Sequence, residues 1–133
     1  MPKVDVSVGE LFDKLSILEI KASKGLDVDT EKQKLLDVYQ EYNNTLTRYL
    51  YIHLKEINSS LWLIEDKKRS LEKEQNFHDD FIHYARLVYI LNDHRARLKK
   101  EIDKVCNSEI REKKSHDGTV SYTHLRAHET SID

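Results

Sequence analysis

The residues best suited to chemistry are two charged side chains that fall within the apolar stripes of predicted helices. Glu19 lies among the apolar positions of the first predicted helix, and Arg95 lies in the middle of the apolar face of the third. Glu65 and Asn92 flank the apolar stripes of their own helices. A charge in an apolar interior is tolerated only when it is paired and hydrogen-bonded. The pattern therefore predicts a buried polar network of Glu19, Glu65, Asn92 and Arg95.

This network has two interpretations, which the sequence alone leaves open. In the first, Arg95 pairs with Glu19 or Glu65, and the buried ion pair fixes the register of the helices. In the second, Glu19 and Arg95 line a polar pocket that binds a phosphorylated or nucleotide-sugar anion, with Lys14 or Lys21 assisting. The first interpretation is favoured, because buried charge pairs commonly contribute specificity of packing more than net stability.

The other reactive residue types do not assemble a catalytic or metal-binding motif. Asp80 and His83 have helical spacing, but a di-metal bundle site needs two Glu-x-x-His motifs and further carboxylates. The Glu10–Asp13 pair resembles half of the carboxylate array of all-α nucleotide pyrophosphatases, without the other half. Cys106 has no histidine at a useful helical spacing, and there is no glycine-rich phosphate loop. We therefore expect no catalytic residue, no metal and no cofactor.

Three long helical segments must position the charged residues. The first spans residues 7–24, where a capping box and a terminal glycine mark the two ends. The second covers residues 31–74, and its apolar pattern shifts register near the weak helix formers within residues 43–51. The third spans residues 76–104. The sequence predicts an all-α, up-and-down bundle of three main helices, with the middle helix bent or broken within residues 43–51.

Composition and charge narrow the class of protein. The chain has 133 residues, 35% of them charged, with three Gly, one Pro and one Cys. This length predicts one domain, and the single cysteine fits a reducing compartment, so we expect a cytoplasmic protein. A net charge of −2 gives no general attraction to nucleic acid. No apolar run is long enough to span a bilayer, so we expect no membrane insertion.

The C-terminal segment has the character of translated sequencing adaptor. Val120–Thr130, with the sequence VSYTHLRAHET, can be encoded by the transposase adaptor that is used in sequencing libraries, which is typical of a metagenomic sequence. We therefore expect a single helical domain at 1–118 and a non-native, disordered tail at 119–133, and we leave that tail out of fold reasoning.

Four segments cover most of the chain before the tail: SVGELFDKLSILEIK at 7–21, INSSLWLIEDKKR at 57–69, ARLVYILNDHRARLKKEID at 85–103 and SEIREKK at 108–114. Together they resemble one family of small bacterial and phage proteins of unknown function, DUF6165. Members of this family often lie near genes for glycan or lipopolysaccharide assembly. The resemblance thus implies a link to envelope-glycan assembly, and it supplies no catalytic residues.

The function that fits these observations is a non-catalytic accessory or scaffolding protein that acts through helix–helix contacts. A small enzyme or binding protein for a phosphorylated or nucleotide-sugar anion is the alternative. We also expect a protein partner or a homo-oligomer, because Ile17, Ile20 and Trp62 remain after the main apolar stripes are assigned.

Overall fold

A computed structural model describes residues 1–107 of the chain, and all of its regular elements are helices. The helices are α1 (Val8–Ser23), α2 (Asp29–Tyr39), a short 3-10 helix η1 (Gln40–Tyr42), α3 (Thr45–Lys73) and α4 (Asp79–Val105). None of them is long and apolar enough to cross a membrane. The all-α prediction is confirmed.

Local side-chain chemistry explains where these helices begin. The Ser7 hydroxyl accepts a hydrogen bond from the backbone N–H of Glu10 at 3.2 Å, as the capping-box pattern predicts for the start of α1. Asn44 and Thr47 form a reciprocal capping box at the start of α3. Gly25, with a φ of 86°, follows the end of α1 in the left-handed region that glycine adopts readily.

The prediction of three main helices is wrong, because the middle segment is two separate α-helices. The chain leaves the helical conformation at Asn43 and Asn44 and restarts at Thr45, where the Asn44 side chain caps the new helix. This break lies inside the predicted interval 43–51. The chain therefore has four α-helices within residues 1–107.

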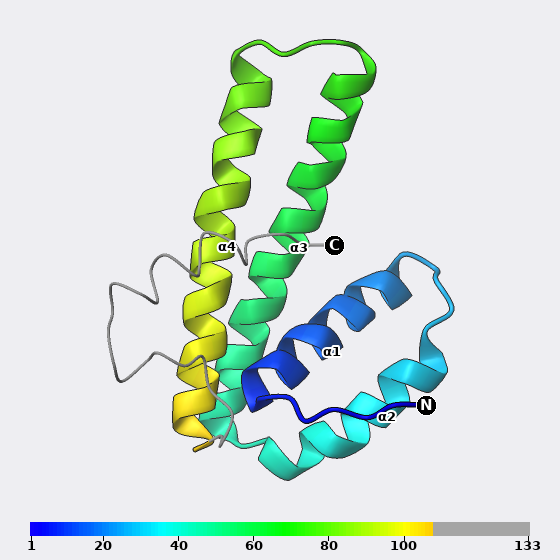
Figure 1. Ribbon diagram of the computed structural model, residues 1–133, viewed down its shortest axis with the longest axis vertical. Coiled ribbons are helices and arrows are strands. Elements are labelled where there is room, and N and C mark those ends of the chain that lie inside the picture. Colours follow the sequence, from blue (N-terminus) through cyan, green and yellow to red (C-terminus); the bar gives the residue numbers. More distant parts are fainter. Residues whose placement is uncertain (108–133) are drawn as a thin grey trace.

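The two longest helices form a hairpin on which the others pack. Figure 1 shows α3 and α4 side by side and antiparallel, with α1 crossing their lower half and α2 lying beside α1. The upper half of the hairpin, near the α3–α4 turn, extends beyond α1 and α2 (Figure 1). The domain is thus thick at one end, and a two-helix hairpin projects from it.

The apolar core sits where α1 meets the hairpin. It includes an aromatic triad of Phe12, Tyr39 and Tyr51, whose ring centroids lie 4.9–5.8 Å apart in tilted or edge-on pairs. The other buried members of the core are Val8, Leu11, Leu15, Leu50, Leu54 and Ile102. Burial of these side chains provides the main driving force for docking α1.

The apolar residues that suggested an exposed contact surface are covered by the chain itself. Ile20 is buried, and Ile17 and Trp62 are half-buried. The Lys24 ammonium lies 5.4 Å from the centre of the Trp62 ring, within range of a cation–π interaction. Since α1 lies between the hairpin and α2, these residues offer little surface to a second copy, and the expected homo-oligomer stays a prediction (Figure 1).

Candidate functional site

The most concentrated polar chemistry in the described chain is a buried ion pair between α1 and α4. Arg95 donates to Asp13 through Nε at 2.9 Å and through Nη2 at 2.6 Å, so that both carboxylate oxygens are engaged. The side chains of Arg95 and Asp13 are only 12% and 4% exposed. This two-bond geometry uses the planar guanidinium fork and is the strong form of a charge pair.

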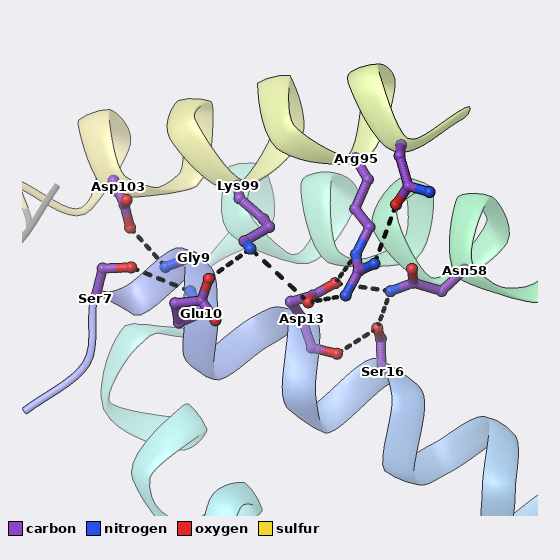
Figure 2. A network of polar contacts seen from close by, with 10 residues as sticks. Ser7, Gly9, Glu10, Asp13, Ser16, Asn58, Arg95, Lys99 and Asp103 are labelled. Atoms are coloured by element: carbon purple, nitrogen blue, oxygen red, sulfur yellow. Dashed lines mark hydrogen bonds and ion pairs between the residues drawn. The ribbon is translucent and has the colours of Figure 1, made fainter. Parts of the chain in front are cut away.

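Asn58 extends this pair to α3. Its Nδ2 atom donates to Asp13 Oδ1 at 2.9 Å and to Ser16 Oγ at 2.8 Å, and the Ser16 hydroxyl donates to the Asp13 carbonyl at 2.8 Å. Figure 2 shows Asp13 and Ser16 projecting from α1 toward Arg95 and Asn58. One carboxylate on α1 therefore holds side chains from both helices of the hairpin.

Two further residues of α4 complete the surroundings of the ion pair. Asn92 Oδ1 accepts from Arg95 Nη1 at 3.2 Å, while its own Nδ2 donates to the Val88 carbonyl at 3.1 Å. Lys99 pairs with Glu10, and its Nζ lies 4.0 Å from Asp13 Oδ2. Arg95 thus has a neutral neighbour that orients it, and Asp13 has a second cation nearby.

The first turn of α1 is tied to the far end of α4 by a second contact. The backbone N–H of Gly9 donates to Asp103 Oδ1 at 2.6 Å, and Asp103 is buried. A Cβ at position 9 would collide with the Lys99 carbonyl and lie 2.9 Å from Asp103 Oδ1. Glycine is therefore required by close approach of the two helices, and the Asp103 carboxylate stabilises the positive end of the α1 dipole.

The electrostatics of Asp13 follow from these contacts. Burial alone would raise the pKa of Asp13, but the hydrogen bonds and charge of Arg95 outweigh that effect. Lys99 and the Asn58 amide act in the same direction, and the pKa of Asp13 falls below its usual 3.8. Asp13 is therefore ionised at neutral pH, and it is unsuited to act as a general acid.

Glu19 belongs to a different cluster. Its carboxylate accepts a hydrogen bond from the Tyr51 hydroxyl and lies 3.5 Å from Lys55 Nζ. Burial, the hydrogen bond to Glu19 and the charge of Glu19 all raise the pKa of Tyr51, so the phenol stays protonated as a donor. Glu19 does have partners, as its position in the apolar stripe requires, but they lie on α3.

The predicted network is therefore only partly assembled, and the pairing of Arg95 with Glu19 or Glu65 is wrong. Asn92 and Arg95 do meet, but Glu65 pairs with Lys68 on its own helix. Glu19 follows Asp13 by six positions, which places their side chains about 120° apart around α1 and about 9 Å apart along it. One guanidinium cannot serve both positions.

The predicted anion pocket receives no support from this geometry. Arg95 is engaged by Asp13. Lys14 is exposed, and Lys21 is half-buried in the last turn of α1. Glu19 and Arg95 therefore do not line one pocket with the two lysines.

The other candidate residues do not form a second site. Within residues 1–107, no three His, Cys, Asp or Glu side chains are placed to hold a metal ion. Burial, and then the nearby Asp103 charge, raise the pKa of the Cys106 thiol, which disfavours a thiolate nucleophile. Asp80 and His83 are both exposed near the start of α4.

The sequence analysis named Asp13 only beside Glu10 and missed its place at the centre of this network. It lies beside the main apolar stripe of α1, on a second buried stripe of Gly9, Asp13, Ser16 and Ile20. Positions separated by four, three and four residues share one face of a helix. A carboxylate between a glycine and a serine at this spacing indicates close helix contact, and this signal was present in the sequence.

Comparison with known proteins supports the family resemblance. A family model described as a family of unknown function (DUF6165) matches residues 2–128. No curated protein and no solved structure gives a significant match. The match includes residues 119–128, which the sequence analysis attributes to adaptor; that segment lies outside the described residues, and its origin stays a prediction. Because the match covers nearly the whole sequence, the chain belongs to the DUF6165 family.

Proposed function

We propose that this protein is a non-catalytic accessory or scaffolding protein of bacterial envelope-glycan assembly, which acts through contacts between its helices and other proteins. In this proposal the polar network of Asp13, Ser16, Asn58, Asn92 and Arg95 is a structural clamp that holds α1 on the hairpin. The genomic association implied by the family resemblance supports the pathway.

The observation that carries the proposal is the engagement of Arg95 by Asp13. An anionic ligand would have to displace a carboxylate that already receives two N–H groups of the guanidinium in a nearly water-free position. Displacement would leave Asp13 buried without its main counter-charge, which is strongly unfavourable. The network therefore favours a closed structural role over ligand exchange.

The surface of the projecting half of the hairpin is suited to protein contacts. Large apolar side chains with substantial exposure are spread over the projecting half of the hairpin, including Leu63, Phe77, Ile82, Tyr89 and Ile90. A hairpin with such side chains on its surface offers more contact area to another helix than to a small molecule.

The test has a ligand arm and a protein arm. The purified full chain is titrated with nucleotide sugars, and the melting temperature and nucleotide-sugar turnover are measured. It is then offered, one at a time, the purified glycan-assembly enzymes that neighbouring genes encode. We expect no melting shift, no turnover and saturable binding to one of the enzymes.

Alanine substitution of an exposed residue far from the hairpin, Lys34→Ala, serves as the surface control and should leave that binding unchanged. Turnover of a nucleotide sugar by the protein alone, or a saturable melting shift without enzyme binding, would refute the scaffold.

A further inference from the structure

A shallow groove runs along one face of the projecting hairpin. It has a volume of about 410 Å³, and its apolar walls are Leu63 and Leu71 of α3 and Tyr84 of α4. Its polar lining consists of Asp66, Lys67, Ser70, Glu74 and Asp80. We call this surface the hairpin groove.

The hairpin groove faces away from α1. Asn58, which contacts α1, precedes Leu63 by five residues, so Leu63 points about 140° away around α3. Ile90 likewise points about 160° away from Asn92, the residue that holds Arg95. Leu63 and Ile90 are 56% and 38% exposed, and Leu87 beside them is half-buried. No described part of the chain covers the centre of this face.

Charges along this face are arranged for pairing with a copy of the same face. Glu56 and Lys67 are both exposed and lie on one side of α3, since eleven residues correspond to about three turns. The tip of the groove is acidic, with Glu74 and Asp80. The lower half of α4 is basic on balance at its surface, where the exposed charges are Arg97, Glu101 and Lys104.

The spacing of these charges is symmetrical about the middle of the hairpin. The midpoint of Glu56 and Lys67 lies near Leu61, and Leu61 is about as far below the α3–α4 turn as Asn92 is on α4. A two-fold axis at this level therefore places Glu56 of one copy against Lys67 of the other. It also brings Asp80 of each copy to the basic lower half of the other α4.

We propose that the hairpin groove, together with the neighbouring Leu87 and Ile90 of α4, is the contact surface between two copies of this chain, packed antiparallel as a four-helix assembly with Leu63 at its centre. Parallel packing would instead bring the two acidic tips together, which is unfavourable. This inference deepens the proposed scaffolding function by naming the face that joins two copies, and it leaves the other exposed apolar residues of the hairpin to the envelope-glycan partner.

The first measurement is the mass of the full chain by light scattering at high micromolar concentration. We expect a mass near twice the 15.8 kDa of one chain. Leu63→Lys should shift the protein to a monomer with unchanged helical content. The matched control is Ile82→Lys, because Ile82 is 54% exposed against 56% for Leu63 but lies outside the groove lining. This control should remain a dimer.

A charge exchange tests the antiparallel arrangement. Lys67→Glu and Glu56→Lys should each weaken the dimer by roughly twofold to thirtyfold, because each reversal disturbs two symmetry-related surface pairs. The double variant should recover most of the wild-type affinity, whereas Lys34→Glu on exposed α2 should have no effect. A wild-type monomer, a dimer that survives Leu63→Lys, or no recovery in the double variant would overturn the proposal.

Failure of the dimer proposal can be distinguished from failure of the proposed scaffolding function. A monomer that still binds a glycan-assembly enzyme overturns the dimer alone. A dimer that turns over nucleotide sugars overturns the scaffold alone.

Discussion

Removal of the Arg95 guanidinium is the most direct perturbation of the polar network. Arg95→Met should lower the free energy of unfolding by about 3–5 kcal/mol, because it leaves the Asp13 carboxylate buried without its main counter-charge. Asp13 is 4% exposed, so water can replace little of the lost interaction. Asn58 Nδ2 at 2.9 Å and Lys99 at 4.0 Å remain near the carboxylate, which favours the lower end of that range.

The size of this change makes it readily measurable. A single domain typically has a free energy of unfolding of about 5–15 kcal/mol, so Arg95→Met should move the urea midpoint far below that of the wild type. Replacing both partners, as in Asp13→Leu with Arg95→Met, should recover much of the loss, since the desolvation penalty disappears with the charges. The assay is a double-mutant cycle by urea denaturation, followed by circular dichroism.

The Glu19–Lys55 pair is the internal control for this cycle. Its two side chains are 28% and 42% exposed, and water screens the pair, so its coupling energy should not exceed about 1 kcal/mol. If the coupling between Asp13 and Arg95 is no larger than that of the control, the network is not a clamp. Arg95→Met with wild-type stability would refute the reasoning as well.

Three further predictions concern Gly9, Asp13 and the C-terminal segment. Gly9→Ala should destabilise the protein by about 1–3 kcal/mol in urea denaturation, because the new methyl group collides with the Lys99 backbone, which cannot move aside without separating α1 from α4. The pKa of Asp13 is depressed in the folded state, so the ionised carboxylate should contribute its full stability at pH values well above 3.8, its usual pKa. This contribution should be lost as the pH falls through and below 3.8. Asp13→Asn should flatten the slope of stability against pH in this acid range, measured by denaturation at a series of pH values. Deletion of residues 119–133 should leave helical content and melting temperature unchanged, whereas a large loss on deletion would show that this segment contributes to the fold.

Local sequence signals predicted the helical class and the main break correctly. Capping boxes and period-3.6 stripes depend on neighbours within one or two turns, so Ser7 and the register shift near Asn44 could be interpreted without tertiary information. The number of helices was underestimated, because no Gly or Pro marks the break. Asn44 caps the start of a new helix. In the sequence alone, the asparagines at 43–44 are equally compatible with weak helix formers inside one bent helix.

The partner of Arg95 could not be predicted by the same means. A stripe analysis finds charges that violate the apolar pattern of their own helix, and it found Glu19 and Arg95. Asp13 does not violate that pattern, since it occupies a second stripe whose burial depends on how α1 crosses the hairpin. Tyr51 and Lys55, the partners of Glu19, likewise become neighbours only through tertiary packing.

The polar network gives α1 one position on a hairpin whose apolar seam continues beyond it. Phe81 and Tyr84 extend the seam toward the turn as half-buried residues, so apolar contact alone would define the position of α1 weakly. Two specific contacts, Asp13 with Arg95 and Gly9 with Asp103, must instead form together. A slip of α1 by one turn, about 5.4 Å, would break both and leave buried charges unpaired. Such a clamp keeps α1 on the lower half of the hairpin, and it thereby leaves the projecting half open to a second copy of the chain and to another protein.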